Sequence, residues 1–253
     1  MQLNYVEPEN IKVNPDAIIN NKQIGEKNHP VIVVDDFLLD PHKLISEYVE
    51  PTPLVLNTID SNSLMPGWIG QVSNRFYEID SAVTQLLDLY TDFDIPEEEI
   101  EDHIWNYQIN VIHGGCKCAR KCIQPHVDPA MMAFVLYLNE DDQQGGTGFY
   151  RHSEAGDMNL ENVDKSFKRT SDYWKYKEWQ FEKMRDNRDE YIDFDSGLMD
   201  DAWEEYHYEP MKFNRLILYP AYIFHSSIMK MDWYTESPRV SLSGFIDKSY
   251  FTE

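Results

Sequence analysis

Short apolar runs separated by turn residues limit the fold of this chain more than any other feature of its sequence. Strand-like runs cover residues 103–112, 131–138, 147–151, 214–219 and 239–246. Glycine, proline and polar residues bound them, as is typical of several strands that pair in sheets. Such a series favours a β-sandwich or a β-barrel.

Helices are expected beside these strands. A β-branched run at residues 31–34 predicts a further strand, and Asp40 followed by Pro41 resembles a helix N-cap followed by the first helical position. That helix is expected to continue through Tyr48. Residues 78–92 carry apolar side chains at helical spacing and predict a second helix. The expected class is therefore mainly β with flanking helices.

Residues 153–210 differ from the rest of the chain. They are charged, rich in tryptophan and tyrosine, and poor in β-branched residues. This composition predicts a helical, charged insertion on the β core. All 253 residues (1–253) are expected to form one domain, because β-sandwiches and barrels of this length are often single domains.

The charge balance disfavours polyanionic partners. The chain has 22 basic and 45 acidic residues and a formal net charge of −23. Proteins that bind phosphate backbones or anionic membranes neutralise them with clustered Lys and Arg, and this sequence has no such cluster. Neither nucleic acid nor a membrane is therefore expected as a partner. No apolar run approaches the roughly 20 residues that span a bilayer, and the first residues lack a signal segment. A soluble, cytoplasmic protein is expected, and its oligomeric state stays open.

A candidate metal site begins with His126 and Asp128, which directly precede the apolar run 131–138. In a regular strand, residues two apart point to the same side, so these two side chains are expected to converge. A second histidine, His225, follows the hydrophobic run that ends at Pro220. Two histidines and one carboxylate form the facial arrangement of non-haem Fe(II) oxygenases.

An anion-binding pair follows near the end of the chain. Arg239 and Ser241 share one face of the last predicted strand. The planar fork of an arginine binds a carboxylate through two parallel hydrogen bonds, and a serine hydroxyl can complete the contact. The sequence thus places a carboxylate anchor after the three candidate metal ligands.

In this order and context, the chain resembles the Fe(II)- and 2-oxoglutarate-dependent dioxygenases, especially their prolyl-4-hydroxylase-like branch. The matching motifs are His126-Val127-Asp128, Tyr137-Leu138-Asn139, Gly145-Gly146-Thr147-Gly148-Phe149, His225 and Arg239-Val240-Ser241. Each motif is weak alone, but their joint order is fairly specific.

The resemblance implies a double-stranded β-helix, which is a cupin-like jelly roll. It implies that His126, Asp128 and His225 bind Fe(II), and that Arg239 and Ser241 hold the C5 carboxylate of 2-oxoglutarate. With O₂ as the second co-substrate, the implied reaction is hydroxylation. The substrate would be an amino acid, a peptide or protein side chain, or a small metabolite.

Two departures from the family pattern stand out. His225 follows Asp128 by 97 residues (225 − 128), a long separation that the insertion accounts for. Many relatives also hold 2-oxoglutarate with a tyrosine at the position of Ile112. Four residues are candidates for that role here: Tyr107, Gln108, Asn110 and Tyr137.

Two alternatives remain open at this point. One is a non-catalytic jelly-roll protein that binds a metal or another ligand. The other is a zinc-dependent role of the loop that contains Cys116, Cys118 and Cys122. Its C-x-C-x3-C spacing matches no standard zinc pattern, which favours thiols that are held reduced in a loop near the iron site.

Overall fold

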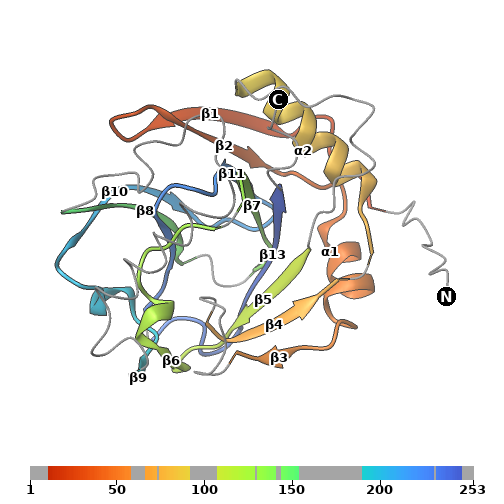
Figure 1. Cartoon of the computed structure of the whole chain (residues 1–253). Coiled ribbons are helices and arrows are strands. Elements are labelled where there is room, and N and C mark those ends of the chain that lie inside the picture. Colours follow the sequence, from red (N-terminus) through yellow and green to blue (C-terminus); the bar gives the residue numbers. More distant parts are fainter. Residues whose placement is uncertain are drawn as a thin grey trace, which may run out of the picture.

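Antiparallel strands dominate the computed structural model of this chain (Figure 1). The structure describes residues 11–57, 66–72, 74–91, 107–128, 130–140, 144–153, 190–230 and 232–246. Among these residues, no helix is long and apolar enough to cross a membrane.

The larger sheet has eight strands. Their order is β1-β2-β11-β7-β13-β5-β4-β3. The bounds are Ile18–Ile24 for β1, His29–Asp35 for β2, Leu216–Pro220 for β11, Met132–Tyr137 for β7, Arg239–Ile246 for β13, Gln108–Ile112 for β5, Trp68–Gln71 for β4 and Val55–Leu56 for β3.

A smaller, three-stranded sheet has the order β10-β8-β12, with bounds Trp203–Pro210, Gly146–His152 and His225–Ile228. From β7 onward the core strands alternate between the two sheets: β7 is in the larger sheet, β8 and β10 in the smaller, β11 in the larger, β12 in the smaller and β13 in the larger. This alternation makes the fold a double-stranded β-helix, as the sequence predicts.

The central strand β7 is buried on both faces of the larger sheet. All its residues are buried. Phe134 and Leu136 belong to a cluster on the outer face, whereas Val135 and Tyr137 belong to a second cluster on the inner face. A strand that is buried on both faces gives a continuous apolar run in the sequence, which is why residues 131–138 are so easily recognised.

The helices cover the outer face of the larger sheet. Helix α1 (Pro41–Leu44) begins at Asp40, whose carboxylate accepts a hydrogen bond from the Lys43 N–H, and continues as the π-helical segment η1 (Ile45–Val49). Helix α2 (Tyr77–Tyr90) lies near β2 in Figure 1. Its buried apolar side chains belong to the outer cluster and are Ile79, Val83, Leu86 and Leu87.

The remaining elements are short. Strands β6 (Lys117–Ala119) and β9 (Tyr191–Asp193) form a two-stranded sheet. Single 3₁₀ turns cover Arg120–Cys122 and Ser196–Leu198. Strand β6 and the first of these turns contain two of the three cysteines, Cys118 and Cys122.

One prediction about secondary structure is wrong in part. The helical insertion was predicted for residues 153–210, but 203–210 form β10 and pair with β8, and 191–193 form β9 and pair with β6. Most residues of β10 are exposed or half-buried, so the strand lacks the apolar alternation that identifies strands in a sequence. Residues 154–189 of the predicted insertion lie outside the described residues.

Candidate metal centre and its neighbouring arginine

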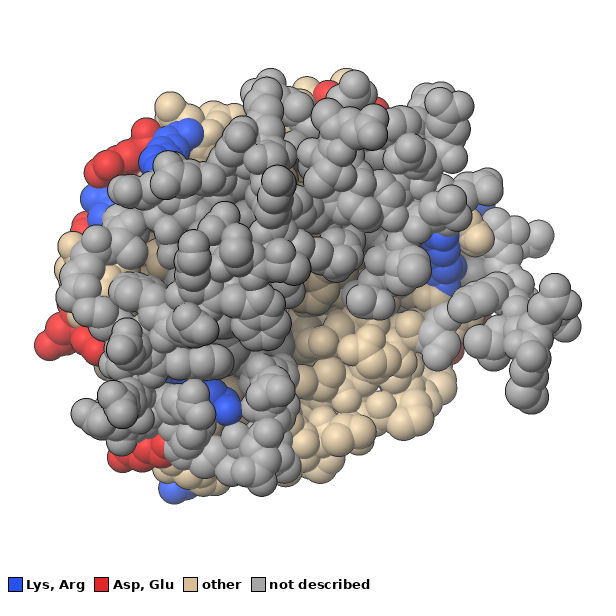
Figure 2. Space-filling model, in the orientation of Figure 1, with Lys and Arg blue, Asp and Glu red and all other residues tan. Residues whose placement is uncertain are grey.

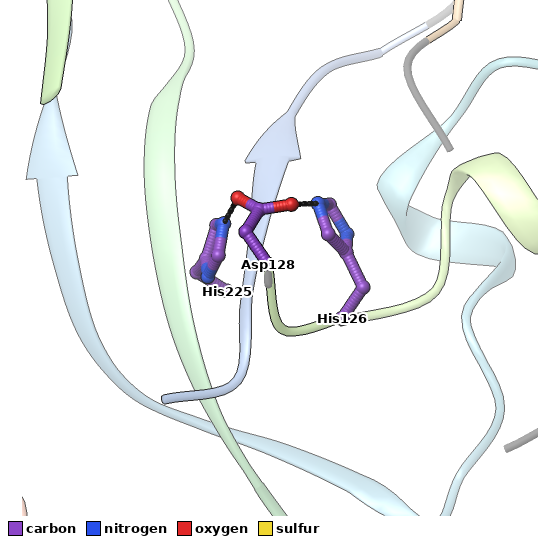
Figure 3. Close-up of side chains that lie close together, drawn as sticks. All are labelled: His126, Asp128 and His225. Carbon is purple, nitrogen blue, oxygen red and sulfur yellow. Dashed lines mark hydrogen bonds and ion pairs between the residues drawn. The ribbon is translucent and has the colours of Figure 1, made fainter. Parts of the chain in front are cut away.

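His126, Asp128 and His225 converge at the point where the two sheets meet, although 97 residues separate Asp128 from His225 (Figure 3). Each of them offers one ligand atom, and these atoms all lie within 4.8 Å of one another. Among the described residues, no other group of three or more His, Cys, Asp and Glu side chains brings its ligand atoms this close together.

Backbone pairing fixes this arrangement. The N–H of His126 donates to the carbonyl of His225 at 2.9 Å, and the N–H of His225 donates back to the carbonyl of His126 at 2.9 Å. Residues that exchange both bonds lie directly opposite each other, with side chains on the same face. The Asp128 N–H donates to the carbonyl of Ala221 at 2.8 Å, which holds the third ligand beside them.

Second hydrogen bonds orient both imidazoles. Nδ1 of His225 lies 2.8 Å from the carbonyl oxygen of Ile223, and Nδ1 of His126 lies 3.4 Å from that of Gln124. A carbonyl can only accept, so each Nδ1 donates to it, and in this orientation Nε2 is the nitrogen that could bind a metal ion. Both Nε2 atoms face the Asp128 carboxylate (Figure 3).

The spacing of the three groups fits one small cation. Nε2 of His225 lies 3.1 Å from Oδ2 of Asp128, and Nε2 of His126 lies 3.9 Å from Oδ1 of Asp128. Two ligands at right angles on one ion, each bound at about 2.1 Å, are about 3 Å apart. The His225–Asp128 pair has this spacing, and the His126 ring needs a small shift to reach it.

The predicted carboxylate anchor is a buried guanidinium. Arg239 is 1% exposed and lies on the inner face of the larger sheet. Its Nη1 donates to Oγ of Ser241 at 3.4 Å, and its guanidinium lies 5.5 Å from the centre of the Tyr137 ring. No described carboxylate forms an ion pair with Arg239, and its Nε has no hydrogen-bond partner among the described residues. A buried charge without a partner is costly, so this one indicates the place of an anionic ligand.

Asn139 explains how Arg239 is held. Its side-chain amide donates to the carbonyl of Pro238 at 2.6 Å and accepts from the N–H of Val240 at 2.7 Å. These two residues flank Arg239. The asparagine of the Tyr-Leu-Asn motif therefore fixes the backbone from which the guanidinium projects.

Tyr219 links the two parts of the site, and the sequence analysis does not identify it. Its ring lies 4.8 Å from the ring of His225, edge-on. Burial, followed by the negative charge of Asp128, raises the pKa of Tyr219, whereas the positive charge of Arg239 opposes this rise. Both charges therefore act on the same buried phenol. Its contact with His225 joins β11 of the larger sheet to β12 of the smaller sheet, and no sequence motif marks it.

The other predicted co-substrate residues share the inner face. Asn110 pairs with Ser241 across β5 and β13, and Gln108 pairs with Ser243. Tyr137 pairs with Ser241 from the other side, and its hydroxyl lies 2.8 Å from Oγ1 of Thr147. Burial raises the pKa of Tyr137, so it is a neutral phenol at physiological pH.

Tyr107 and Ile112 lie on opposite faces of the sheet. Tyr107 belongs to the outer cluster, where its hydroxyl donates to Asp80. Ile112 belongs to the inner cluster and pairs with Arg239. Of the four candidates for the family's tyrosine role, Tyr107 is therefore the one that faces away from the site.

The cysteine loop is not brought together as a metal site. Cys116, Cys118 and Cys122 form no disulfide, and the last two are buried. Contact with the thiol of Cys122, together with burial, raises the pKa of Cys118, and burial raises the pKa of Cys116. Both thiols are therefore protonated at neutral pH. Among the described residues, the three thiols do not form a group of ligand atoms within 4.8 Å of one another, as His126, Asp128 and His225 do.

Comparisons with known proteins place the chain in a family. Residues 15–241 match the family described as "Family of unknown function (DUF6445)". No curated protein matches the chain in sequence.

Solved structures also resemble the chain. One is the non-heme α-ketoglutarate-dependent epimerase SnoN from nogalamycin biosynthesis, which is 11% identical with a TM-score of 0.40, over 86% of this chain and 76% of that chain. Another is a prolyl 4-hydroxylase from Phytophthora capsici, which is 13% identical with a TM-score of 0.39, over 87% of this chain and 59% of that chain.

Proposed function

The chain belongs to the DUF6445 family, and we propose that it is an Fe(II)- and 2-oxoglutarate-dependent dioxygenase that hydroxylates its substrate. One observation carries the proposal. A convergent His-Asp-His group and a buried guanidinium without a carboxylate partner among the described residues border the same inner cluster, because Tyr219 packs against His225 and Tyr137 lies beside Arg239.

His126, Asp128 and His225 would hold the metal. The lone pairs of two Nε2 atoms and one carboxylate oxygen occupy one side of an ion and leave its remaining positions to other ligands. When bound, Fe(II) would supply the oxidative chemistry, which couples the decarboxylation of 2-oxoglutarate by O₂ to hydroxylation of a C–H bond.

Arg239 would bind the distal carboxylate of 2-oxoglutarate. Two N–H groups of its fork donate to the two carboxylate oxygens, and the Ser241 hydroxyl donates a further hydrogen bond. Because the guanidinium is buried, the contact is shielded from water and strong. Tyr137 and Thr147 complete the wall of the interior on the side of the smaller sheet.

The surrounding side chains keep water away. Phe149 is fully buried and packs edge-on against Tyr219 at 5.3 Å between ring centres. Ile223 is also fully buried, and like Phe149 it belongs to the inner cluster. An apolar shell of this kind limits side reactions of a strong oxidant.

Succinate formation tests the proposal. The protein is incubated with Fe(II), 2-oxoglutarate and air, alone and with panels of amino acids, peptides and metabolites. We expect slow, substrate-free succinate formation that a suitable substrate accelerates, and loss of both in Asp128→Ala. Equal succinate formation by the parent and by Asp128→Ala would contradict the proposal.

A further inference from the structure

The inner face of the larger sheet does not end at the buried site. Ser241 pairs with Asn110, Asn110 with Ile69, and Ile69 with Val55 across β13, β5, β4 and β3. Directly paired residues lie on one face, so this row leads outward from the strand that carries Arg239. Ser241 and Asn110 are fully buried, Ile69 is half-buried and Val55 is 70% exposed. The face that holds the proposed co-substrate thus continues onto the molecular surface.

A chain of side-chain amides runs along the same face. Nε2 of Gln71 donates to Oε1 of Gln108 at 3.4 Å, and Nε2 of Gln108 donates to Oδ1 of Asn110 at 2.6 Å. Nδ2 of Asn110 then donates to Oγ of Ser243 at 2.9 Å. We call Gln71, Gln108, Asn110 and Ser243 the amide row. Its outer end is exposed at Gln71, and its inner end is buried at Ser243.

The chemistry of the amide row selects neutral, amide-like ligands. Each side-chain amide has two N–H donors and one carbonyl acceptor, and the row uses one N–H of each. Because Gln71 is exposed, its second N–H and its carbonyl oxygen remain open to a ligand that offers both an acceptor and a donor. A peptide bond offers both, whereas a carboxylate only accepts and an ammonium group only donates.

Strands β3, β4 and β5, at the outer part of the amide row, carry no charged residue. The sequences of β3 (VL), β4 (WIGQ) and β5 (QINVI) contain no acidic or basic residue, although the whole chain has a net charge of −23. Figure 2 shows an uncharged surface over β3 and β4. Exposed apolar side chains at this edge are Leu54, Val55, Leu56 and Trp68. A charged ligand would lose its hydration here without an opposite charge in return.

Strand β3 is an edge strand in the described part of the larger sheet. Among the described residues it pairs with β4 alone and ends the strand order. An extended peptide can align with such an edge and use both its backbone groups and its side chains for binding.

We propose that the amide row and the exposed edge of β3 and β4 bind the backbone of an uncharged peptide segment, so that the substrate is a peptide or protein. The inference rests on the proposed function for the site of reaction, and it names the substrate class that this site accepts. Free amino acids and organic acids are poor substrates on this view, because no charged side chain of β3, β4 or β5 compensates their charges.

Steady-state kinetics with capped peptides tests the substrate class. The probes are pools of N-acetylated, C-amidated neutral peptides, and the matched pools have free termini or are single amino acids. Peptide-stimulated succinate formation above the substrate-free rate is measured for the parent, for Gln71→Leu and for Gln85→Leu. Gln85 is an exposed glutamine of α2 and serves as the matched control.

We expect capped peptides to stimulate the parent and Gln85→Leu equally. In Gln71→Leu their KM should rise roughly fivefold to tenfold with kcat unchanged, because one or two hydrogen bonds are lost. In Gln85→Leu the substrate-free rate and the KM for 2-oxoglutarate should also stay at the parent values, because Gln85 lies on α2, away from the amide row. Stimulation by free amino acids alone, or an unchanged peptide KM in Gln71→Leu, would overturn the inference.

Direct binding separates this inference from the proposed function. Fluorescence anisotropy of labelled capped peptides is measured for the parent, for Val55→Asp and for Ile18→Asp, which puts the same charge on the exposed edge strand β1. We expect binding that weakens in Val55→Asp and not in Ile18→Asp. Peptide binding without succinate formation would contradict the proposed oxygenase function and support peptide binding at β3 and β4. Succinate formation without peptide binding would support the oxygenase function and contradict the peptide-binding inference.

Discussion

Two buried or largely buried arginines, Arg215 and Arg239, differ in whether a carboxylate among the described residues pairs with them. Arg215 is largely buried and forms two bonds to the Asp35 carboxylate, at 2.6 and 3.0 Å, and this pairing lowers the pKa of Asp35. Arg239 is more deeply buried and has no such partner among the described residues. We propose that the first arginine stabilises the fold, and that the second destabilises it until an anion binds.

Replacing Arg239 should therefore stabilise the ligand-free protein while weakening its co-substrate. We expect Arg239→Met to raise the free energy of unfolding by about 1–2 kcal/mol, because a buried, unpaired charge is removed. It should raise the KM for 2-oxoglutarate roughly a hundredfold, because a buried charge-assisted contact is lost. Urea unfolding and succinate formation measure the two effects.

Arg215→Met is the matched control for this experiment. It leaves Asp35 without its main partner, so it should lower the free energy of unfolding. A loss of stability in Arg239→Met like that of Arg215→Met would show that Arg239 is a structural residue.

Asp128 supplies the only charged ligand of the candidate metal centre. Its removal leaves two neutral imidazoles, so Asp128→Ala should bind Fe(II) at least roughly tenfold more weakly. Asp201→Ala, which changes an exposed aspartate in a turn, is the control and should bind like the parent. Anaerobic calorimetry measures both affinities, and equal affinity in the two variants would remove Asp128 from the site.

The candidate ligands could be predicted from the sequence, but their surroundings could not. His126, Asp128, His225 and Arg239 lie in recognisable motifs. Tyr219 lies in no motif, because its proximity to His225 depends on how β11 and β12 sit in different sheets. Side-chain neighbours across a sheet depend on strand register, which a single sequence does not specify.

At the scale of single elements, α2 is tied to the sheet by a buried acid. Asp80 of α2 accepts hydrogen bonds from the Tyr107 hydroxyl and, at 3.0 Å, from Nε of Arg75. Burial raises the pKa of Asp80 to about 6, against the opposing effects of these two partners. In the unfolded chain an aspartate has a pKa of about 3.9.

The folded protein therefore binds a proton at Asp80 more tightly than the unfolded chain. Its stability contribution is fully present below about pH 4 and is lost as the pH rises through about 6. Asp80→Asn cannot titrate, so relative to this variant the parent should lose roughly 2–3 kcal/mol between pH 4 and pH 7. Urea unfolding at several pH values measures the difference, and parallel curves for the two proteins would contradict the raised pKa.

The pairing of β7 and β13 depends on one glycine. A Cβ on Gly244 would lie 2.3 Å from ring atoms of Phe134, its cross-strand partner. Gly244→Ala should therefore lower the free energy of unfolding by about 1–3 kcal/mol. Phe134→Leu makes room for the methyl group, so the alanine should cost less in the double variant. Additive losses in thermal or urea unfolding would show that the two residues are not coupled.

Strands were predictable where they are buried and not where they are exposed. Strands β7, β8, β11 and β13 lie within one or two residues of the predicted runs, because burial requires apolar side chains in sequence. Strand β10 was missed, because most of its residues face solvent and its composition resembles that of the charged segment before it.

At the scale of the whole molecule, the jelly roll brings distant segments to one place. The alternation of strands between two sheets carries the chain back to the metal centre after 97 residues, and β13 then places Arg239 on the shared inner face. In Figure 2 the described surface over β3 and β4 carries no charged side chain, although the whole chain has a net charge of −23.

Anaerobic titration of Fe(II) and 2-oxoglutarate into the protein tests this arrangement most directly. A ferrous ion chelated by 2-oxoglutarate has a weak visible charge-transfer absorption. We expect this band in the parent only when both are present, its loss in Asp128→Ala, and a much higher 2-oxoglutarate requirement in Arg239→Met. A parent protein that binds Fe(II) and 2-oxoglutarate without the band, or binds neither, would contradict the account.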